Sequence, residues 1–239
     1  MKRFLEMIDH ALFPYRCACC GRVIDRPDAV CSACGKQLKR IEGTTCPLCG
    51  REEQNCRCKG KGCHYESLAA PFLYQGVIRQ GIGRLKFHAQ VRAAGFFGAE
   101  MEKTVRERFC GVTFDLVTCV PMTLKKKKQR GFNQSELLAR VLAERLEVPY
   151  CAQALMKQYE TKEQHTLNAV QRRANVLGIY QAQGDLVEDK RILLVDDVST
   201  TGATFDECAK VCLFAGSNEV YCVAAALSVM ADKGSSSRS

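Results

Sequence analysis

Paired cysteines near the start of the chain constrain its fold more than any other feature. The chain has 239 residues and 16 cysteines, and ten of these cysteines lie between Cys17 and Cys63. Eight of the ten form close pairs: Cys17 with Cys20, Cys31 with Cys34, Cys46 with Cys49, and Cys56 with Cys58. A Cys-x-x-Cys knuckle presents two sulfurs to one metal ion, and two knuckles complete a tetrahedral zinc site. The spacing therefore predicts two structural Zn²⁺ ions.

The alternative for so many cysteines in a short segment is a disulfide framework, which is typical of secreted domains. Lys2 and Arg3 resemble the basic start of a signal peptide, but Glu6 and Asp9 interrupt the apolar run that should follow. No stretch approaches the ~18 apolar residues that a membrane span needs. We therefore expect a cytoplasmic protein without membrane insertion, in which these cysteines bind metal.

The sequence leaves the pairing of the knuckles open. Sequential pairing places the first two knuckles on one zinc ion, but an interleaved cross-brace fits the spacing equally well, and Cys19 or Cys63 can replace a neighbouring ligand. A closed Cys₄ site has no open coordination position, which argues against metal catalysis. The zinc ions either only hold a small domain together, or that domain also contacts nucleic acid or protein through Arg22, Arg26, Lys36, Lys39 and Arg40. We expect chelation to unfold this module and to spare the rest.

The net charge gives weak support for a polyanionic partner. The formal charge is +9. Eight zinc-bound thiolates contribute −8 and two Zn²⁺ ions contribute +4, which lowers +9 to +5. The chain is therefore basic, but only modestly so.

Composition divides the chain near residues 62 to 66. We expect residues 1–64 to form an N-terminal helix and a double zinc-ribbon module, residues 65–230 to form an α/β domain, and residues 231–239 to be a disordered tail. Apolar strand-like runs alternate with amphipathic helical patterns in the second part, which favours a mostly parallel sheet flanked by helices. The patterns predict strands at 114–120, 191–195 and 219–227 and helices at 133–146, capped by Asn133, and 204–214.

A strand–loop–helix pattern at residues 192–204 has the clearest chemical meaning. An apolar strand ends in two adjacent carboxylates, and a Ser/Thr/Gly loop then leads into a helix. The N–H groups of such a loop and the positive end of the helix suit a phosphate, and an acidic pair suits the two hydroxyls of a ribose. Gly202 allows the backbone to approach the phosphate. The predicted ribose-phosphate site consists of Asp196, Asp197, Ser199, Thr200, Thr201, Gly202, Ala203 and Thr204.

This segment resembles the signature of type I phosphoribosyltransferases. Further segments narrow the resemblance to the competence protein F (ComF) family: Val120-Pro121 followed by RGFNQ at 130–134, LKF at 85–87, and Gln164 with Arg172 and Asn175. A zinc module in front is also that family's arrangement, and the resemblance covers about residues 17 to 227. It implies the type I phosphoribosyltransferase fold plus a small Cys-rich zinc-ribbon domain, with 5-phosphoribosyl-1-pyrophosphate as the ligand.

The resemblance assigns the turn after Val120 to the pyrophosphate, which binds together with Mg²⁺. The residues assigned are Pro121, Met122, Thr123 and Arg130. Residues 157–173 resemble a flexible loop that closes over the site, where Lys157 stands in place of the expected arginine and loses its bidentate fork. If the chain is an enzyme, the implied catalytic residues are Asp196, Asp197, Arg130 and Lys157.

Three functions remain open on this basis. The resemblance implies a competence protein that binds phosphoribosyl pyrophosphate and single-stranded DNA during natural transformation, with a helicase-like competence ATPase as a partner. The second is a transferase that moves ribose 5-phosphate to an acceptor and releases pyrophosphate. The third is a scaffold that acts through its zinc module and keeps a vestigial site.

Single-stranded DNA needs cations for its phosphates and aromatic rings for its bases. The predicted contacts are Lys86, Lys125, Lys126, Lys127 and Lys128. The lysine run equally fits a solvated basic face, or a source of cations for the pyrophosphate. Phe87, Phe96 and Phe97 are candidates for stacking on bases, and core packing is their alternative role.

Overall fold

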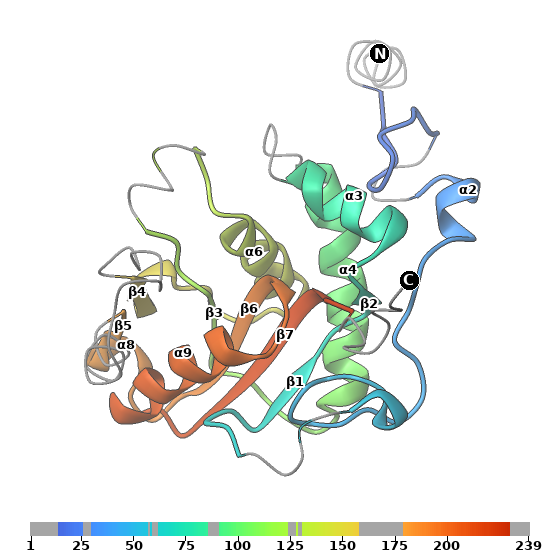
Figure 1. The fold of residues 1–239 in the computed structure, drawn as a ribbon. Helices are drawn as coiled ribbons and strands as arrows, with labels where there is room; N and C mark the ends of the chain where they lie inside the picture. Colours follow the sequence, from blue (N-terminus) through green and yellow to red (C-terminus); the bar gives the residue numbers. More distant parts are fainter. Residues whose placement is uncertain are drawn as a thin grey trace, which may run out of the picture.

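A parallel sheet centred on strand β6 (Arg191–Ser199) organises the fold (Figure 1). The computed structural model describes residues 14–25, 30–56, 58, 62–85, 91–123, 128, 131–157 and 179–229. Within these ranges the strand order is β1 (Ser67–Ala69), β7 (Glu219–Leu227), β6 and β3 (Leu116–Cys119), and β2 (Phe72–Leu73) pairs further along β7. All of these pairs are parallel, so the carboxyl ends of the strands share one edge.

Helices cover both faces of the sheet, as its apolar strands require. Leu193 and Val195 of β6 pack with helices α3 (Gly76–Leu85), α4 (Val91–Arg108) and α6 (Gln134–Leu146). Ile192 and Leu194 point the other way and pack under helix α9 (Ala203–Phe214). The alternation follows from the two-residue period of a strand and explains why the run is continuously apolar.

Smaller elements flank the sheet. The strands β4 (Leu155–Lys157) and β5 (Tyr180–Ala182) form an antiparallel pair beside α9. The 3₁₀ turn η2 (Ala152–Ala154) and the short helix α8 (Gly184–Val187) adjoin this pair. The Cys-rich part holds helix α2 (Ser32–Gly35) and the 3₁₀ turn η1 (Glu53–Asn55).

The structure confirms the predicted fold class, a mostly parallel sheet flanked by helices with a Cys-rich module in front. Asn133 caps α6 as predicted, because its side chain accepts a hydrogen bond from the Ser135 N–H at 3.2 Å. The central strand is longer than predicted. It runs through the acidic pair to Ser199, since Asp196 and Val198 stay in register with Ala224 and Ala226 of β7. The helix and the tail expected at the two ends of the chain lie outside the described residues.

The Cys-rich module packs closely on the α/β domain. The N–H groups of Leu68 and Leu73 donate to Pro47 (2.7 Å) and Lys39 (2.8 Å). Cys17 and Ala18 belong to the same apolar cluster as α4 and α6. The expectation that chelation unfolds the module alone stays a prediction. Loss of the module would expose apolar surface and backbone groups of the larger domain.

The part of the chain that the structure describes contains no helix with both the length and the apolar character that crossing a membrane requires.

The close packing of α4 on α6 depends on Gly98. A Cβ at this position would lie 2.4 Å from Val141 Cγ1, whereas a Cβ at Gly83 of α3 would meet nothing within 4 Å. Gly98→Ala should therefore destabilise the fold by about 1–3 kcal/mol, because the two helices must separate. Gly83→Ala is the matched control and should be neutral or stabilising by up to ~1 kcal/mol. Urea unfolding measures both, and equal effects of the two variants would contradict the packing described.

Candidate functional site

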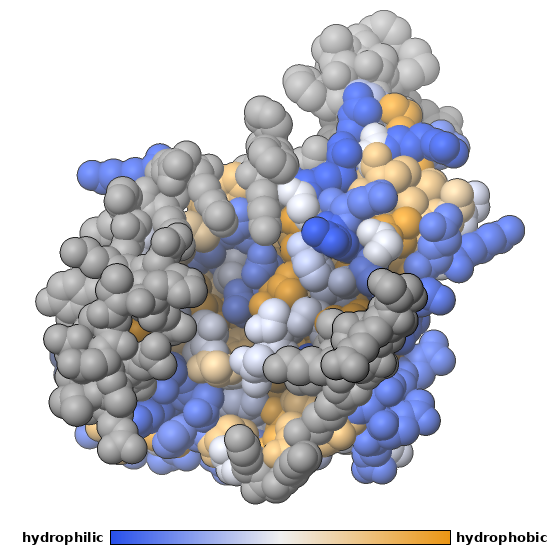
Figure 2. Space-filling view, in the orientation of Figure 1, coloured by the Kyte–Doolittle hydropathy of each residue, from blue (hydrophilic) through white to orange (hydrophobic). Residues whose placement is uncertain are grey.

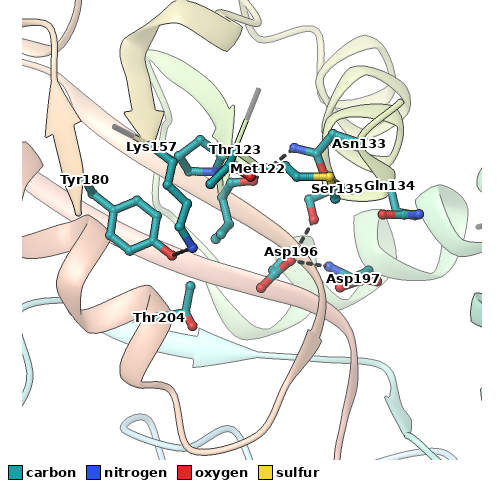
Figure 3. Close-up of a pocket in the computed structure, with 12 residues that line it drawn as sticks. Met122, Thr123, Asn133, Gln134, Ser135, Lys157, Tyr180, Asp196, Asp197 and Thr204 are labelled. Atoms are coloured by element: carbon teal, nitrogen blue, oxygen red, sulfur yellow. Dashed lines mark hydrogen bonds between the residues drawn. The ribbon is translucent and has the colours of Figure 1, made fainter. Parts of the chain in front are cut away.

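A cavity of about 310 Å³ lies at the carboxyl ends of β3 and β6 (Figure 3). Its walls come from the end of β3, the start of α6, the β4–β5 pair, β6 and the start of α9. The lining residues are Val120, Pro121, Met122, Thr123, Asn133, Gln134, Ser135, Lys157, Tyr180, Asp196, Asp197 and Thr204. Most of these side chains are polar, and segments far apart in the sequence bring them together. Ligands of parallel α/β sheets bind at this edge.

The acidic pair of β6 faces the start of α6. Asp196 Oδ1 accepts hydrogen bonds from the Ser135 hydroxyl at 2.7 Å and from the Asp197 N–H at 2.8 Å. Asp197 Oδ1 accepts from the Val198 N–H at 2.8 Å. These bonds fix both carboxylates and use only part of their capacity, since a carboxylate offers about four acceptor positions.

Burial, and after it the neighbouring charge of Asp197, raises the pKa of Asp196 to about 8. The hydrogen bonds from Ser135 and from the backbone of Asp197 oppose the increase. Two adjacent carboxyls that line one cavity favour a ligand that brings hydroxyl donors or a divalent cation.

The loop after β6 has the geometry of an anion site. Gly202 has a φ of +78°, in the left-handed region, and directly precedes α9. A Cβ at Gly202 would lie 2.6 Å from the Tyr65 hydroxyl, so a larger residue does not fit there. Thr200, Thr201, Ala203 and Thr204 are exposed, whereas Ser199 is buried at the end of the strand. The hydroxyls of the exposed threonines and the start of a 12-residue helix offer donors for a phosphate.

The turn after β3 lines the opposite wall. Its Val120 carbonyl accepts from the Asn133 side-chain amide at 3.1 Å, which ties the turn to the α6 N-terminus. Met122 is half-buried and Thr123 is buried. The third wall comes from the β4–β5 pair, where Lys157 Nζ lies 3.3 Å from the Tyr180 hydroxyl and 5.0 Å from the centre of its ring.

The structure thus brings together Asp196, Asp197, Thr204, Lys157 and the turn 121–123, all of which were proposed from the sequence. Residues 199–203 form the adjoining loop. Lys128 is exposed. The other predicted cations (Lys86, Lys125, Lys126, Lys127 and Arg130) lie outside the described residues, as does the predicted flexible loop after Lys157.

Sequence reasoning gave no site role to five lining residues: Val120, Asn133, Gln134, Ser135 and Tyr180. Gln134 is 2% exposed, and its side-chain nitrogen has no hydrogen-bond partner in the described structure. Gln134 and Ser135 directly follow Asn133, so the predicted helix start after the β3 turn was a usable signal for both. No pattern in the sequence pointed to Tyr180, because its place follows from the pairing of β5 with β4.

Two aromatic candidates for DNA stacking are corrected. Phe97 is fully buried and Phe96 is 6% exposed, and both pack against Phe72 in the core. Neither ring is available to a base. Phe87 lies outside the described residues.

The eight paired cysteines form two separate sets in the sequential arrangement. One set is Cys17, Cys20, Cys31 and Cys34, and the other is Cys46, Cys49, Cys56 and Cys58, with the sulfurs of each set within 4.8 Å of one another. The cysteine spacing alone had fitted the interleaved arrangement equally well. Cys19 and Cys63 belong to neither set.

The sulfur positions fit zinc. Cross-knuckle Sγ–Sγ distances are 3.7 Å for Cys20–Cys31 and 3.8 Å for Cys49–Cys56. A tetrahedron with Zn–S bonds of about 2.3 Å has edges of about 3.8 Å. Both sets can therefore hold structural Zn²⁺ with little rearrangement.

The raised pKa of Asp196 predicts a pH-dependent stability. Between its ordinary value of 3.8 and about 8, the folded chain holds a proton on Asp196 that the unfolded chain loses. Stability should therefore fall as the pH rises through this window. Asp196→Asn removes this loss, so the variant should gain stability over the natural chain from pH 5 to pH 8, by at least a few degrees in Tm.

Thermal unfolding at pH 5, 6.5 and 8 checks this expectation. Ser135→Ala is the companion variant, since it removes a hydrogen bond that lowers the pKa of Asp196 and should extend the window upward. A difference between Asp196→Asn and the natural chain that is constant with pH would refute the burial effect.

Comparisons with known proteins agree with this description. Residues 8–66 match the family model of the double zinc ribbon domain. Competence protein ComFC of Bacillus subtilis is 28% identical over 203 residues, which cover 80% of this chain and 81% of the relative. DNA utilization protein YhgH of Escherichia coli O157:H7 is 29% identical over 204 residues, which cover 81% and 89%.

Among solved structures, a glutamine phosphoribosylpyrophosphate amidotransferase from B. subtilis, complexed with ADP and GMP, aligns with a TM-score of 0.42 and 19% identity. The alignment covers 59% of this chain and 30% of that one. The matches to ComFC and YhgH extend over both modules of the chain, as the resemblance seen in the sequence requires. The chain is therefore a homologue of the ComF group of competence and DNA utilization proteins, with a double zinc ribbon in front of its α/β domain.

Proposed function

We propose that the chain binds phosphoribosyl pyrophosphate together with Mg²⁺, binds single-stranded DNA, and acts in DNA uptake during natural transformation. One observation supports the ligand above all: the acidic pair of β6, the start of α9 and the turn after β3 line one cavity. Each of these three parts suits a different part of the same ligand. The names of the relatives, competence protein and DNA utilization protein, support the biological role.

The ligand lies along the cavity in the order of its chemical groups. The 5-phosphate binds the loop at residues 199–204, where N–H groups and hydroxyls are available. The two ribose hydroxyls donate to Asp196 and Asp197. The pyrophosphate, with Mg²⁺, lies toward the turn 121–123 and Lys157. In Figure 3, Asp196 occupies the middle, with Thr204 on one side and Met122 and Thr123 on the other.

Charge balance favours this order. The acidic pair repels a bare phosphate wherever it is ionised, so the neutral sugar must separate it from both phosphorylated ends. A hard divalent cation with oxygen ligands offsets the pyrophosphate charge, and Lys157 adds a further positive charge from the β4–β5 wall.

Single-stranded DNA binds a basic surface away from this cavity. Arg22, Lys36 and Lys39 of the zinc module and Arg79 of α3 are exposed. On the face shown in Figure 2, hydrophilic side chains lie mainly along the outer edge of the coloured surface, and hydrophobic ones are visible in its middle and near α2. The phosphates of the DNA backbone contact these cations of the zinc module, and the base sequence of the DNA has little influence on binding.

A transferase is the second candidate, favoured by the position of Lys157 and Tyr180 across the cavity from the acidic pair (Figure 3). In that reaction the bond from ribose C1 to the pyrophosphate oxygen breaks, and its electrons leave with the pyrophosphate. An acceptor then forms the new bond to C1. Pyrophosphate release in the presence of an acceptor distinguishes a transferase from a binding protein.

Loss of the acidic pair should abolish ligand binding. Asp196→Asn with Asp197→Asn removes the acceptors for both ribose hydroxyls, and calorimetric titration with phosphoribosyl pyrophosphate and Mg²⁺ should show at least a ~100-fold loss of affinity. Ribose 5-phosphate and pyrophosphate, titrated separately, show which half of the cavity binds each group.

The matched control is Glu188→Gln with Asp189→Asn, another adjacent acidic pair, exposed and at the opposite end of β6. This control should bind as the natural chain does. Full affinity in the Asp196/Asp197 variant, with both zinc ions retained, would refute the site.

Affinity for single-stranded DNA should fall steeply with salt. Each neutralised phosphate contributes about −0.7 to the slope of log K against log salt. Lys36→Gln with Lys39→Gln should reduce the slope by about 1.4, whereas Lys210→Gln on α9 should leave it unchanged. Fluorescence anisotropy of a labelled oligonucleotide at several salt concentrations measures the slope. An affinity that does not change with salt would rule out this mode of binding.

A further inference from the structure

One arginine of the zinc module reaches the phosphate loop. Arg51 is 6% exposed, and its Nη2 donates to the Thr200 carbonyl at 2.7 Å and to the Ser228 carbonyl at 3.0 Å. Thr200 follows β6 and Ser228 follows β7. The guanidinium therefore joins the ends of two neighbouring strands beside the loop that the proposed function assigns to the 5-phosphate.

The second zinc site sets the position of Arg51. This residue follows Cys49 and Gly50, and its carbonyl accepts from the Cys46 N–H at 2.8 Å, which closes the knuckle. Gly50 has a φ of +68°, and a Cβ there would lie 2.8 Å from the Leu68 carbonyl. The knuckle is thus pressed against β1, and its metal ligands fix the backbone from which Arg51 extends.

A second contact leads from the same knuckle to the same loop. The Leu48 carbonyl, between Cys46 and Cys49, accepts from the Tyr65 hydroxyl at 2.6 Å. That hydroxyl fills the space beside Gly202, where a Cβ would lie 2.6 Å from it. The knuckle consequently supports the loop at Thr200 through Arg51 and at Gly202 through Tyr65.

The Arg51 contact also orients a donor of the loop. In a trans peptide the C=O and the N–H point in opposite directions. With the Thr200 carbonyl held on Arg51, the N–H of Thr201 points away from the zinc module, toward the side left for an anion. A buried positive charge behind the loop adds a favourable field for a phosphate.

We propose that Arg51 is a positioning residue that couples the second zinc site to the phosphate loop. Zinc bound by Cys46, Cys49, Cys56 and Cys58 holds the loop ready for a phosphorylated sugar, and loss of that zinc weakens sugar-phosphate binding. Coupling between two sites is reciprocal, so the bound sugar phosphate raises the affinity of the second site for zinc. This inference rests on the proposed function for the identity of the ligand, but not for the state of the loop.

The test uses Arg51→Gln in the full, zinc-loaded chain, with ribose 5-phosphate as the probe. Calorimetry should show affinity reduced by about 5- to 150-fold, the usual range of coupling between two sites. Hydrogen exchange of the amides of residues 199–204 should become faster without any ligand. Arg51→Lys keeps the charge but not the planar group, and should restore part of both properties.

Arg84→Gln is the matched control, since Arg84 Nη1 donates to the Cys20 carbonyl at 3.4 Å and so links the first zinc site to α3 instead. It should leave both the affinity and the loop exchange unchanged. If Arg51→Gln keeps both zinc ions while its affinity stays within about twofold and its loop exchange is unaltered, or if Arg84→Gln gives the same changes, the coupling is refuted.

Two further outcomes can be distinguished from a failure of the coupling. If the natural chain does not bind ribose 5-phosphate, the proposed function fails, while loop exchange in Arg51→Gln still decides the positioning role. If Arg51→Gln does not fold, the natural chain provides the test: at equilibrium, saturating ribose 5-phosphate should raise the chelator concentration needed to remove one of the two zinc ions. The same chelator concentration with and without the sugar phosphate would overturn the coupling.

Discussion

The parallel pairing of β6 between β3 and β7 is the constraint on which the rest of the structure depends. Because helices cover both faces of this strand, every residue from Ile192 to Val195 must be apolar. Polar groups become tolerable only where the strand leaves the core, and all neighbouring strands leave it at the same edge. The acidic pair, the phosphate loop and the β3 turn therefore meet there, whatever their distance in the sequence.

Near the N-terminus, metal ligation compensates for the lack of an apolar core. The segment around Cys46 to Cys58 has few apolar residues of its own, and four metal–sulfur bonds replace the core that it lacks. The fixed knuckle then serves as a rigid support. From it, the Leu48 carbonyl accepts from the Tyr65 hydroxyl, and Arg51 donates to the carbonyls of Thr200 and Ser228, just beyond the ends of β6 and β7. The metal–sulfur bonds that give the module its shape therefore also position Leu48 and Arg51 for their contacts with the α/β domain.

The sequence predicted the elements whose pattern is local. The strand at 191–195, the cap at Asn133 and the last strand at 219–227 were all predictable, because burial on both faces, capping and β-propensity act over a few residues. The acidic pair and loop were readable because their chemistry is contiguous. The pairing of the knuckles was not readable, since the interleaved and sequential arrangements have the same spacing.

Contacts between distant segments were beyond the sequence for the same reason. Ser135 bonds to Asp196 across 61 positions, and Arg51 bonds to Thr200 across 149. Nothing in the residue types distinguishes Arg51 from the other arginines of the zinc module, and only the docked fold shows that it is buried. Phe96 and Phe97 are the converse case: aromatic residues suit stacking on DNA as well as a core, and the packing on Phe72 decides between the two.

The packing of the zinc module on the α/β domain also covers one edge of the sheet. Strands β1 and β2 lie at the outer side of β7, where unpaired N–H and C=O groups would invite a strand from another molecule. The zinc module covers that edge through backbone hydrogen bonds. The Leu68 and Leu73 N–H groups donate to the carbonyls of Pro47 and Lys39, and the Ile41 N–H donates to the Pro71 carbonyl. The zinc module thus also protects the chain against self-association. Without it, the α/β domain would expose an unpaired sheet edge that can pair with another copy.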